Sequence, residues 1–284
     1  IVLPHGVLFR GGEEGTIRKN LIDHNNIDAI IGLPANIFFG TGIPTIIMVL
    51  RKNKRDSDVL IIDASKGFEK NGKNKLRACD IKRIVDAYKE RPEKIEKFAR
   101  RVSRAEIVQN DYNLNIPRYV DSSEKAENWD IYASMFGGIP EAELQDLSAY
   151  WTAFPHLKAA LFSPDNDAYC RLNVANLKNA VLSHPDVVAF KTAFENAFGD
   201  FDAYLKSALI DGMTQLNAAG EEERLSREIF ARLAGIPLVD RYAAYQLLDD
   251  DWKKIAIDLE IIQTEGFAAT KQVDPNMVLK KDAE

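Results

Sequence analysis

Two adjacent aromatic residues, Phe38 and Phe39, have a residue type and a position that suggest a role in ligand binding. They lie in the stretch GLPANIFFGTGIPT, residues 32–45, whose three glycines and two prolines favour a turning backbone between apolar runs. A ring at the carboxyl edge of a sheet can stack on a flat ligand, and a nucleobase is a good candidate. The alternative is that both rings pack in the core, which their spacing alone favours.

Nearby polar residues carry weaker signals. Gly40 and Gly42 lack the spacing of either common phosphate-binding loop, so a plain turn is expected there. Asp63 ends an apolar run, where α/β proteins often bind ligands, but no glycine fingerprint precedes it. A capping or pairing role is therefore expected for Asp63. Ser65 has no partner arrangement that would make it a nucleophile.

The cysteines and histidines do not form a metal-binding pattern. Cys79 and Cys170 are far apart in the sequence, and the four histidines are scattered. We therefore expect two reduced, buried thiols and no metal site. No run of about 18 apolar residues and no basic-then-apolar leader occurs, so a cytoplasmic protein without a membrane span is expected.

The first third of the chain predicts an α/β arrangement. Three apolar runs that do not alternate suit strands buried on both faces: 28–33, 45–50 and 59–62. An amphipathic helix is expected before them, over Glu13 to Ile22. These elements predict part of a mostly parallel, helix-covered sheet, in which the last two strands are open to an antiparallel arrangement.

The middle of the chain is basic. Residues 51–104 hold 18 Lys and Arg against 9 Asp and Glu, a net charge of +9, whereas the whole chain carries −6. This excess fits local contact with a polyanion, and a solvated helical face is the alternative. A helix is expected around Ile84, and the alternation of Tyr112, Leu114 and Ile116 predicts a half-buried strand.

Helices dominate the prediction after residue 121. The expected helices are 140–150, 169–182, 186–198, 201–219, 222–233 and a last long helix for which Asp240 is the predicted N-cap. Its heptad-like seam consists of Tyr245, Leu248, Trp252, Ile255, Leu259 and Ile262. This seam either covers its own domain or packs on helices of a partner protein.

Several long strings resemble one known family. LPHGVLFRGGEEGTIRKNLI, IDAIIGLPANIFFGTGIPTIIMVLRK, VLIIDAS and NDYNLNIPRYV resemble, in this order, the methylation subunit of type I restriction–modification systems. Such subunits are adenine-N6 DNA methyltransferases that use S-adenosylmethionine. The match is nearly continuous over residues 1–121, and strings such as YWTAFPHL and DRYAAYQLLDDDW resemble the helical tail of that subunit.

The resemblance implies a mechanism in which the target adenine is flipped out of the duplex and its amino nitrogen attacks the methyl group. It also implies that Phe38, or less directly Phe39, lines the pocket for the extruded base. The family's Asn-Pro-Pro-aromatic motif and glycine-rich cofactor motif do not occur in this sequence. No catalytic or cofactor-binding residue is therefore expected in this chain, and we expect it to be inactive alone.

The resemblance further implies partners and a division of the chain. DNA, a specificity subunit and a restriction subunit would be the partners. Lys70, Lys73 and Lys75 are the predicted contacts to the DNA backbone, and the seam from Tyr245 to Ile262 is the predicted docking face for the specificity subunit. Residues 1–121 would form the later half of a Rossmann-like methyltransferase sheet, and residues 122–284 a helical assembly domain.

Two further expectations remain. Because the chain opens within an apolar, strand-like run, we expect it to be a piece of a larger protein. The rival function is a non-catalytic assembly module that docks a DNA-specificity subunit. A different α/β nucleotide-binding enzyme would require a glycine fingerprint that is absent here.

Overall fold

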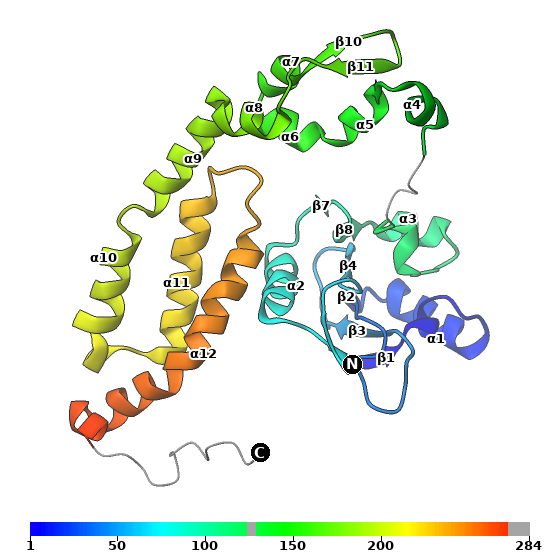
Figure 1. Cartoon of the computed structure of the whole chain (residues 1–284). Coiled ribbons are helices and arrows are strands. Elements are labelled where there is room, and N and C mark those ends of the chain that lie inside the picture. Colours follow the sequence, from blue (N-terminus) through cyan, green and yellow to red (C-terminus); the bar gives the residue numbers. More distant parts are fainter. Residues whose placement is uncertain (124–128, 272–284) are drawn as a thin grey trace. The chain divides into compact units, whose positions relative to one another are not determined.

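The computed structural model describes residues 1–123 and 129–271, which belong to two compact units (Figure 1). The first unit spans Ile1–Ala126 and the second spans Glu127–Glu284. The first is α/β and the second is mostly helical, as predicted. The assignment of the two parts to catalysis and assembly remains a prediction.

The first unit contains eight strands among short helices in its described residues. Its elements are β1 (Val2–Pro4), η1 (His5–Leu8), α1 (Gly12–Asp23), β2 (Ile27–Gly32), β3 (Thr45–Leu50), β4 (Val59–Asp63), β5 (Glu69–Asn71), β6 (Lys73–Lys75), α2 (Ala78–Glu90), β7 (Lys94–Ile95), β8 (Ala99–Val102), α3 (Arg104–Gln109) and η2 (Ile116–Arg118).

Six of these strands form one mixed sheet in the order β1-β3-β2-β4-β8-β7. Only β2 and β4 pair in parallel, while every other neighbouring pair is antiparallel. The prediction of a mostly parallel sheet was therefore wrong. Strands β3 and β4 are not neighbours either, because β2 lies between them. Unbroken apolar runs report burial on both faces, and this burial is independent of strand direction.

Both faces of the central strands are covered by helices. Alternate residues of β2 divide between the two faces: Ile30 belongs to one apolar cluster with Ile22 of α1, and Ile31 belongs to the other with Ile84 of α2. Fully buried side chains such as Ile61 each contribute about 1.5–3 kcal/mol of hydrophobic stabilisation. The sheet therefore forms a rigid layer whose edges carry the loops.

The strand predicted around Tyr112 does not form. Asp111 and Tyr112 both adopt left-handed backbone angles, with φ of 53° and 56°, and the Asn113 side chain accepts a hydrogen bond from the Asn115 N–H at 2.9 Å. This local turn chemistry replaces a strand ladder. Leu114 is nevertheless buried, so the alternation predicted its burial but not its backbone.

The second unit is built from helices and one small sheet. Its elements are α4 (Ile131–Phe136), β9 (Ile139–Pro140), α5 (Glu141–Asp146), α6 (Ser148–Ala153), α7 (Leu157–Leu161), β10 (Phe162–Pro164), β11 (Tyr169–Leu172), α8 (Leu177–Ser183), α9 (Pro185–Phe198), α10 (Phe201–Leu205), η3 (Lys206–Asp211), η4 (Met213–Gln215), α11 (Ala218–Leu233), α12 (Arg241–Glu265) and η5 (Phe267–Lys271).

Helices α9, α11 and α12 confirm three of the helix predictions, whereas the other three need correction. The expected helix over 140–150 is divided at Leu147 into α5 and α6. The expected helix over 169–182 begins as strand β11, which pairs with β10 and β9, and becomes helical only from Leu177. The expected helix over 201–219 is broken at Gly212. Asp240 caps α12 as predicted, because its carboxylate accepts a hydrogen bond from the Tyr242 N–H at 2.9 Å.

Candidate functional site

The segment between β2 and β3, residues 33–44, forms a loop at the carboxyl end of β2, and we call it the Phe loop. Its base is pinned to the sheet: the Leu33 N–H donates to the Thr45 carbonyl at 2.9 Å, and the Ala64 N–H donates to the Gly32 carbonyl at 2.9 Å. These bonds fix both ends of the loop on rigid strands. The intervening residues project from the carboxyl edge of the parallel β2–β4 pair.

The two rings of the Phe loop lie outside the core. Phe39 is 92% exposed and Phe38 is 41% exposed, and Ile43 on the same loop is 59% exposed. The alternative of core packing was therefore wrong for both rings. Three large apolar side chains on one exposed loop form a surface suited to contact with another molecule.

The backbone of the Phe loop turns at residues that tolerate unusual dihedral angles. Asn36 has φ of 58° and Gly40 has φ of 79°, both in the left-handed region that asparagine and glycine occupy most readily. The Thr41 hydroxyl accepts a hydrogen bond from the Ile43 N–H at 3.1 Å and closes a further turn. The expected plain turn at Gly40 is confirmed.

The hairpin formed by β5 and β6 lies against the Phe loop. Lys73 donates from Nζ to the Asn36 side-chain oxygen at 2.8 Å, and Asn74 donates from its side chain to the Ala35 carbonyl at 2.8 Å. The exposed Lys70 is on the same hairpin. The structure thus brings together two predicted sites that are more than 30 residues apart in the sequence.

The three predicted phosphate contacts have different surroundings. Lys70 and Lys75 are exposed, whereas Lys73 is half-buried and its ammonium group is bound to Asn36. Of the three, Lys70 and Lys75 are therefore the cations open to solvent. Lys73 has a positioning role in the structure.

Asp63, at the end of β4, is occupied by local hydrogen bonds. Its carboxylate accepts from the Ser122 hydroxyl at 2.6 Å and from the Ser65 N–H at 3.0 Å. It therefore has the capping and pairing role that the sequence predicted. Burial lowers the pKa of the nearby His5, and the negative charge of Asp63 partly opposes this shift.

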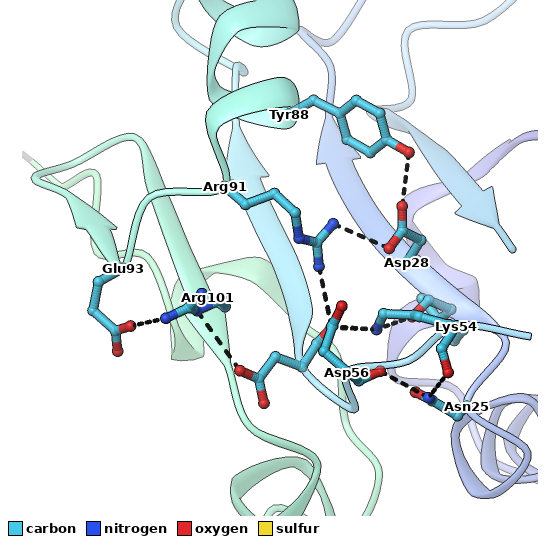
Figure 2. A network of polar contacts seen from close by, with 10 residues as sticks. Asn25, Asp28, Lys54, Asp56, Tyr88, Arg91, Glu93 and Arg101 are labelled. Atoms are coloured by element: carbon cyan, nitrogen blue, oxygen red, sulfur yellow. Dashed lines mark hydrogen bonds and ion pairs between the residues drawn. The ribbon is translucent and has the colours of Figure 1, made fainter.

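Part of the positive charge in residues 51–104 is used inside the fold. Figure 2 shows a network at the opposite end of β2, in which the Asp28 carboxylate accepts from Arg91 at 3.0 Å and from the Tyr88 hydroxyl at 2.7 Å. Lys54 joins it through an ion pair to Asp56 at 3.5 Å, and burial lowers the pKa of Lys54. These cations hold the connection before β4 and are not available to a ligand.

The predicted seam of α12 packs mainly inside its own unit. Trp252 and Leu259 share an apolar cluster with Leu225 of α11, Leu248 packs against that cluster, and Ile262 is buried. The remaining two seam residues differ from these. The Tyr245 hydroxyl donates to Glu222 of α11 at 2.8 Å, and Ile255 is 39% exposed. Of the two alternatives, coverage of its own unit accounts for the buried residues.

Neither the pattern of a metal-binding cluster nor that of a membrane-spanning helix occurs among the described residues. No group of three or more His, Cys, Asp or Glu side chains within residues 1–123 and 129–271 is placed to hold a metal ion. No helix in that part of the chain is long and apolar enough to cross a membrane. Cys79 and Cys170 are both buried and form no disulfide.

Three contacts were missed by reasoning from the sequence. Ser122, Asn36 and Asn74 were not singled out, although each binds a residue that was close to a predicted site. The pattern NGKNK around Asn74 predicts a turn, but a turn does not specify what it packs against. The Asn in LPAN was the available signal for Asn36, since asparagine tolerates left-handed dihedrals.

The chain has known relatives over its first part. Residues 1–128 match the family described as N-6 DNA Methylase. A type I restriction enzyme methylase subunit of Methanocaldococcus jannaschii (MjaVII) is 45% identical over 138 residues, which cover 46% of this chain and 24% of that subunit. The corresponding subunit of Mycoplasma pneumoniae (MpnII) is 41% identical over 133 residues, with the same shares covered.

A solved structure also matches this region. The type I restriction–modification methyltransferase subunit of Streptococcus thermophilus is 59% identical, with a TM-score of 0.42, over 43% of this chain and 26% of that one. The matched region spans about a quarter of the length of these curated relatives. The resemblance predicted from the sequence strings is confirmed: residues 1–128 match the N-6 DNA Methylase family, and the relatives found are methylase subunits of type I restriction enzymes.

Proposed function

We propose that this chain supplies part of the DNA-handling surface of a type I methylase subunit that methylates adenine N6. The subunit would act in the cytoplasm with a specificity subunit and a restriction subunit. The observation that supports this proposal most directly is the exposure of Phe38 and Phe39 on a loop whose ends are pinned to the sheet. An extruded adenine needs an apolar face of this kind on which to stack.

Phe38 is the better candidate for the base contact. It is 41% exposed, so the residue is partly covered by the protein and partly open to a ligand. Phe39, at 92% exposure, has little support from its own chain and would have to be ordered by the ligand. Stacking of a base on an aromatic side chain is worth about 1–3 kcal/mol.

The residues of this chain do not fit S-adenosylmethionine, the proposed methyl donor. Beyond β4 the Asp63 carboxylate already accepts from Ser122 and Ser65, and a side chain at Gly32 would meet the Ile116 side chain at 2.6 Å. Neither strand at this edge is followed by a loop with the glycine spacing of a nucleotide-binding fingerprint. Residues of the methylase other than these would hold the cofactor, and the chain alone would neither bind it tightly nor methylate DNA.

A second candidate is a non-catalytic assembly module that docks the specificity subunit. The observation that favours it is the exposure of Ile255 on α12, beside the otherwise packed seam. Docking of a partner helix on this face is compatible with the first proposal, because the two surfaces are on different units.

Replacement of Phe38 in the complete methylase subunit tests the proposal. In complex with the specificity subunit, Phe38→Ala should lower methylation of cognate DNA by roughly 5- to 150-fold, which corresponds to the stacking energy of one base. With 2-aminopurine at the target position, the same variant should reduce the fluorescence increase that accompanies base extrusion.

Ile43→Ala is the matched control for this experiment. Ile43 is also apolar and exposed on the Phe loop, but it is not an aromatic ring. Its replacement should leave the 2-aminopurine signal close to that of the parent. Equal methylation by the Phe38→Ala variant and the parent would overturn the base-stacking role and favour the assembly module.

A further inference from the structure

The hairpin of β5 and β6 holds the Phe loop through three hydrogen bonds that converge on two consecutive residues. The Asn74 N–H donates to the Asn36 carbonyl at 3.2 Å, and the Asn74 side chain donates to the Ala35 carbonyl at 2.8 Å. Lys73 donates from Nζ to the Asn36 side-chain oxygen at 2.8 Å. The loop is therefore fixed two residues before its first phenylalanine.

The hydrogen bonds from the hairpin fix the backbone conformation of the Phe loop at Asn36. Its φ of 58° places it in the left-handed region, where an asparagine is tolerated at a cost that a local contact must offset. Both its carbonyl and its side-chain oxygen accept hydrogen bonds from the hairpin. The contacts from Lys73 and Asn74 thus stabilise the one backbone conformation from which Phe38 projects.

The grip comes from a short hairpin that also carries accessible cations. In the hairpin register Lys70 lies opposite Asn74, and Lys75 follows Asn74 directly. Lys70 and Lys75 are exposed, whereas Lys73 and Asn74 are partly buried against the loop. Lys73 and Asn74 therefore contact the Phe loop, whereas the exposed Lys70 and Lys75 can contact an anion.

We propose that Lys73 and Asn74 are positioning residues that couple contact of the hairpin with the DNA backbone to placement of Phe38 against the extruded base. The inference rests on the proposed function for the nature of the ligand. The hydrogen bonds between the hairpin and the Phe loop, however, are made entirely by residues of this chain. When phosphates bind Lys70 or Lys75, the hairpin is held in place, and the Phe loop is held with it.

Hydrogen exchange on this chain tests, without DNA, whether the hairpin holds the Phe loop in place. Lys73→Met and Asn74→Ala each remove one donor, so the amide of residue 74, which donates to the Asn36 carbonyl, should exchange roughly two- to tenfold faster, as expected when one of the three contacts is lost. Lys73→Arg keeps a donor and should restore most of the protection. The Tm should change little, because Lys73 and Asn74 lie outside the apolar clusters.

Lys70→Met is the matched control, since it makes the same chemical change on the same hairpin at an exposed position. It should leave exchange of the residue 74 amide unchanged. If this amide exchanges at the parent rate in Lys73→Met and Asn74→Ala, or if Lys70→Met accelerates it equally, the hairpin does not hold the Phe loop and the inference is overturned.

The coupling is tested in the complete methylase with its specificity subunit and 2-aminopurine DNA. Asn74→Ala should lower the extrusion signal severalfold at saturating DNA and reduce kcat, while Lys70→Met should raise KM and weaken the salt dependence of binding. Loss of the signal in Phe38→Ala but not in Asn74→Ala would refute the coupling alone. Faster exchange of the residue 74 amide in Asn74→Ala, with no effect of Phe38→Ala on the signal, would refute the proposed function but not the contact between the hairpin and the Phe loop.

Discussion

His5 connects the first strand to the Phe loop. Its N–H donates to the Pro44 carbonyl at 3.1 Å, and its ring packs edge-on against Phe9 with centroids 5.7 Å apart. The side chain is half-buried, and burial lowers its pKa despite the opposing charge of Asp63. The neutral imidazole is therefore the form that the folded unit favours.

This preference predicts an acid-sensitive stability of the first unit. The pKa of His5 in the folded state lies below its ordinary value of 6.5, so the unfolded chain binds more protons between these two values. Its contribution to stability is complete above pH 6.5 and decreases as the pH falls through the folded pKa. Urea midpoints of the parent and of His5→Gln at pH 7.5 and 5.5 measure this contribution.

We expect His5→Gln to lose less stability than the parent on acidification. Identical slopes for His5→Gln and the parent would contradict the assignment of this dependence to His5.

Single residues also explain where the sequence was informative about the site and where it was not. The composition of the Phe loop predicted a turn beside a sheet, and the turn is present at Gly40. The exposure of Phe39 was not predictable from spacing, because apolar residues in a loop pack inward in some folds and outward in others. The contact between Lys73 and Asn36 joins residues 37 positions apart, and no local pattern encodes it.

At the scale of elements, α11 and α12 form the clearest interface of the second unit. Trp252 is 6% exposed and contacts a cluster that includes Leu216 of the preceding connection and Leu225 of α11. Ile255, three residues further along α12, is 39% exposed. Neighbouring seam positions therefore differ: Trp252 packs in the core of its unit, and Ile255 is open to solvent.

This separation predicts opposite outcomes for two substitutions. Trp252→Ala should destabilise the second unit by about 3–5 kcal/mol, the usual cost of removing a large buried aromatic side chain. Ile255→Asp should change the stability by less than about 1 kcal/mol but should abolish capture of the specificity subunit if the exposed face docks it. Circular dichroism melts and co-purification measure the two effects.

Co-purification of Ile255→Asp at the parent level would remove this face of α12 from the proposed assembly role. A Trp252→Ala variant that melts with the parent would contradict its place in the core.

The elements of the first unit were predictable in kind but not in arrangement. The apolar runs at β2, β3 and β4 were sufficient to predict strands, and the spacing around Ile84 predicted α2. Strand β8 was missed because Arg100 and Arg101 interrupt its apolar pattern, although it pairs with the fully buried β4. Strand order and direction depend on pairing across the sheet, which local composition does not contain.

At the scale of the whole molecule, each unit has its own apolar clusters. In the first unit, the cluster on one face of the sheet includes Ile22 of α1, and the cluster on the other face includes Ile84 of α2. In the second, separate clusters include Leu161 of α7 and Leu225 of α11. Stability should therefore be a property of each unit, because a core substitution removes contacts only within its own cluster.

Thiol labelling can measure whether the two units unfold independently, as we expect. Ile84→Ala and Leu161→Ala should each cost about 2–5 kcal/mol in their own unit. The first should accelerate alkylation of Cys79 alone, and the second should accelerate alkylation of Cys170 alone. Peptide masses after timed exposure to a maleimide distinguish the two sites, and acceleration of both cysteines by either variant would show that the units unfold together.

The two cysteines make this experiment possible without any engineered residue. Cys79 is in the first unit and Cys170 in the second, and both are buried. Burial raises the pKa of Cys79, and the hydrogen bond to Glu141 raises that of Cys170, so both thiols react slowly in the folded protein. The chain thus carries one slowly reacting thiol in each unit, and each thiol becomes reactive only when its own unit unfolds.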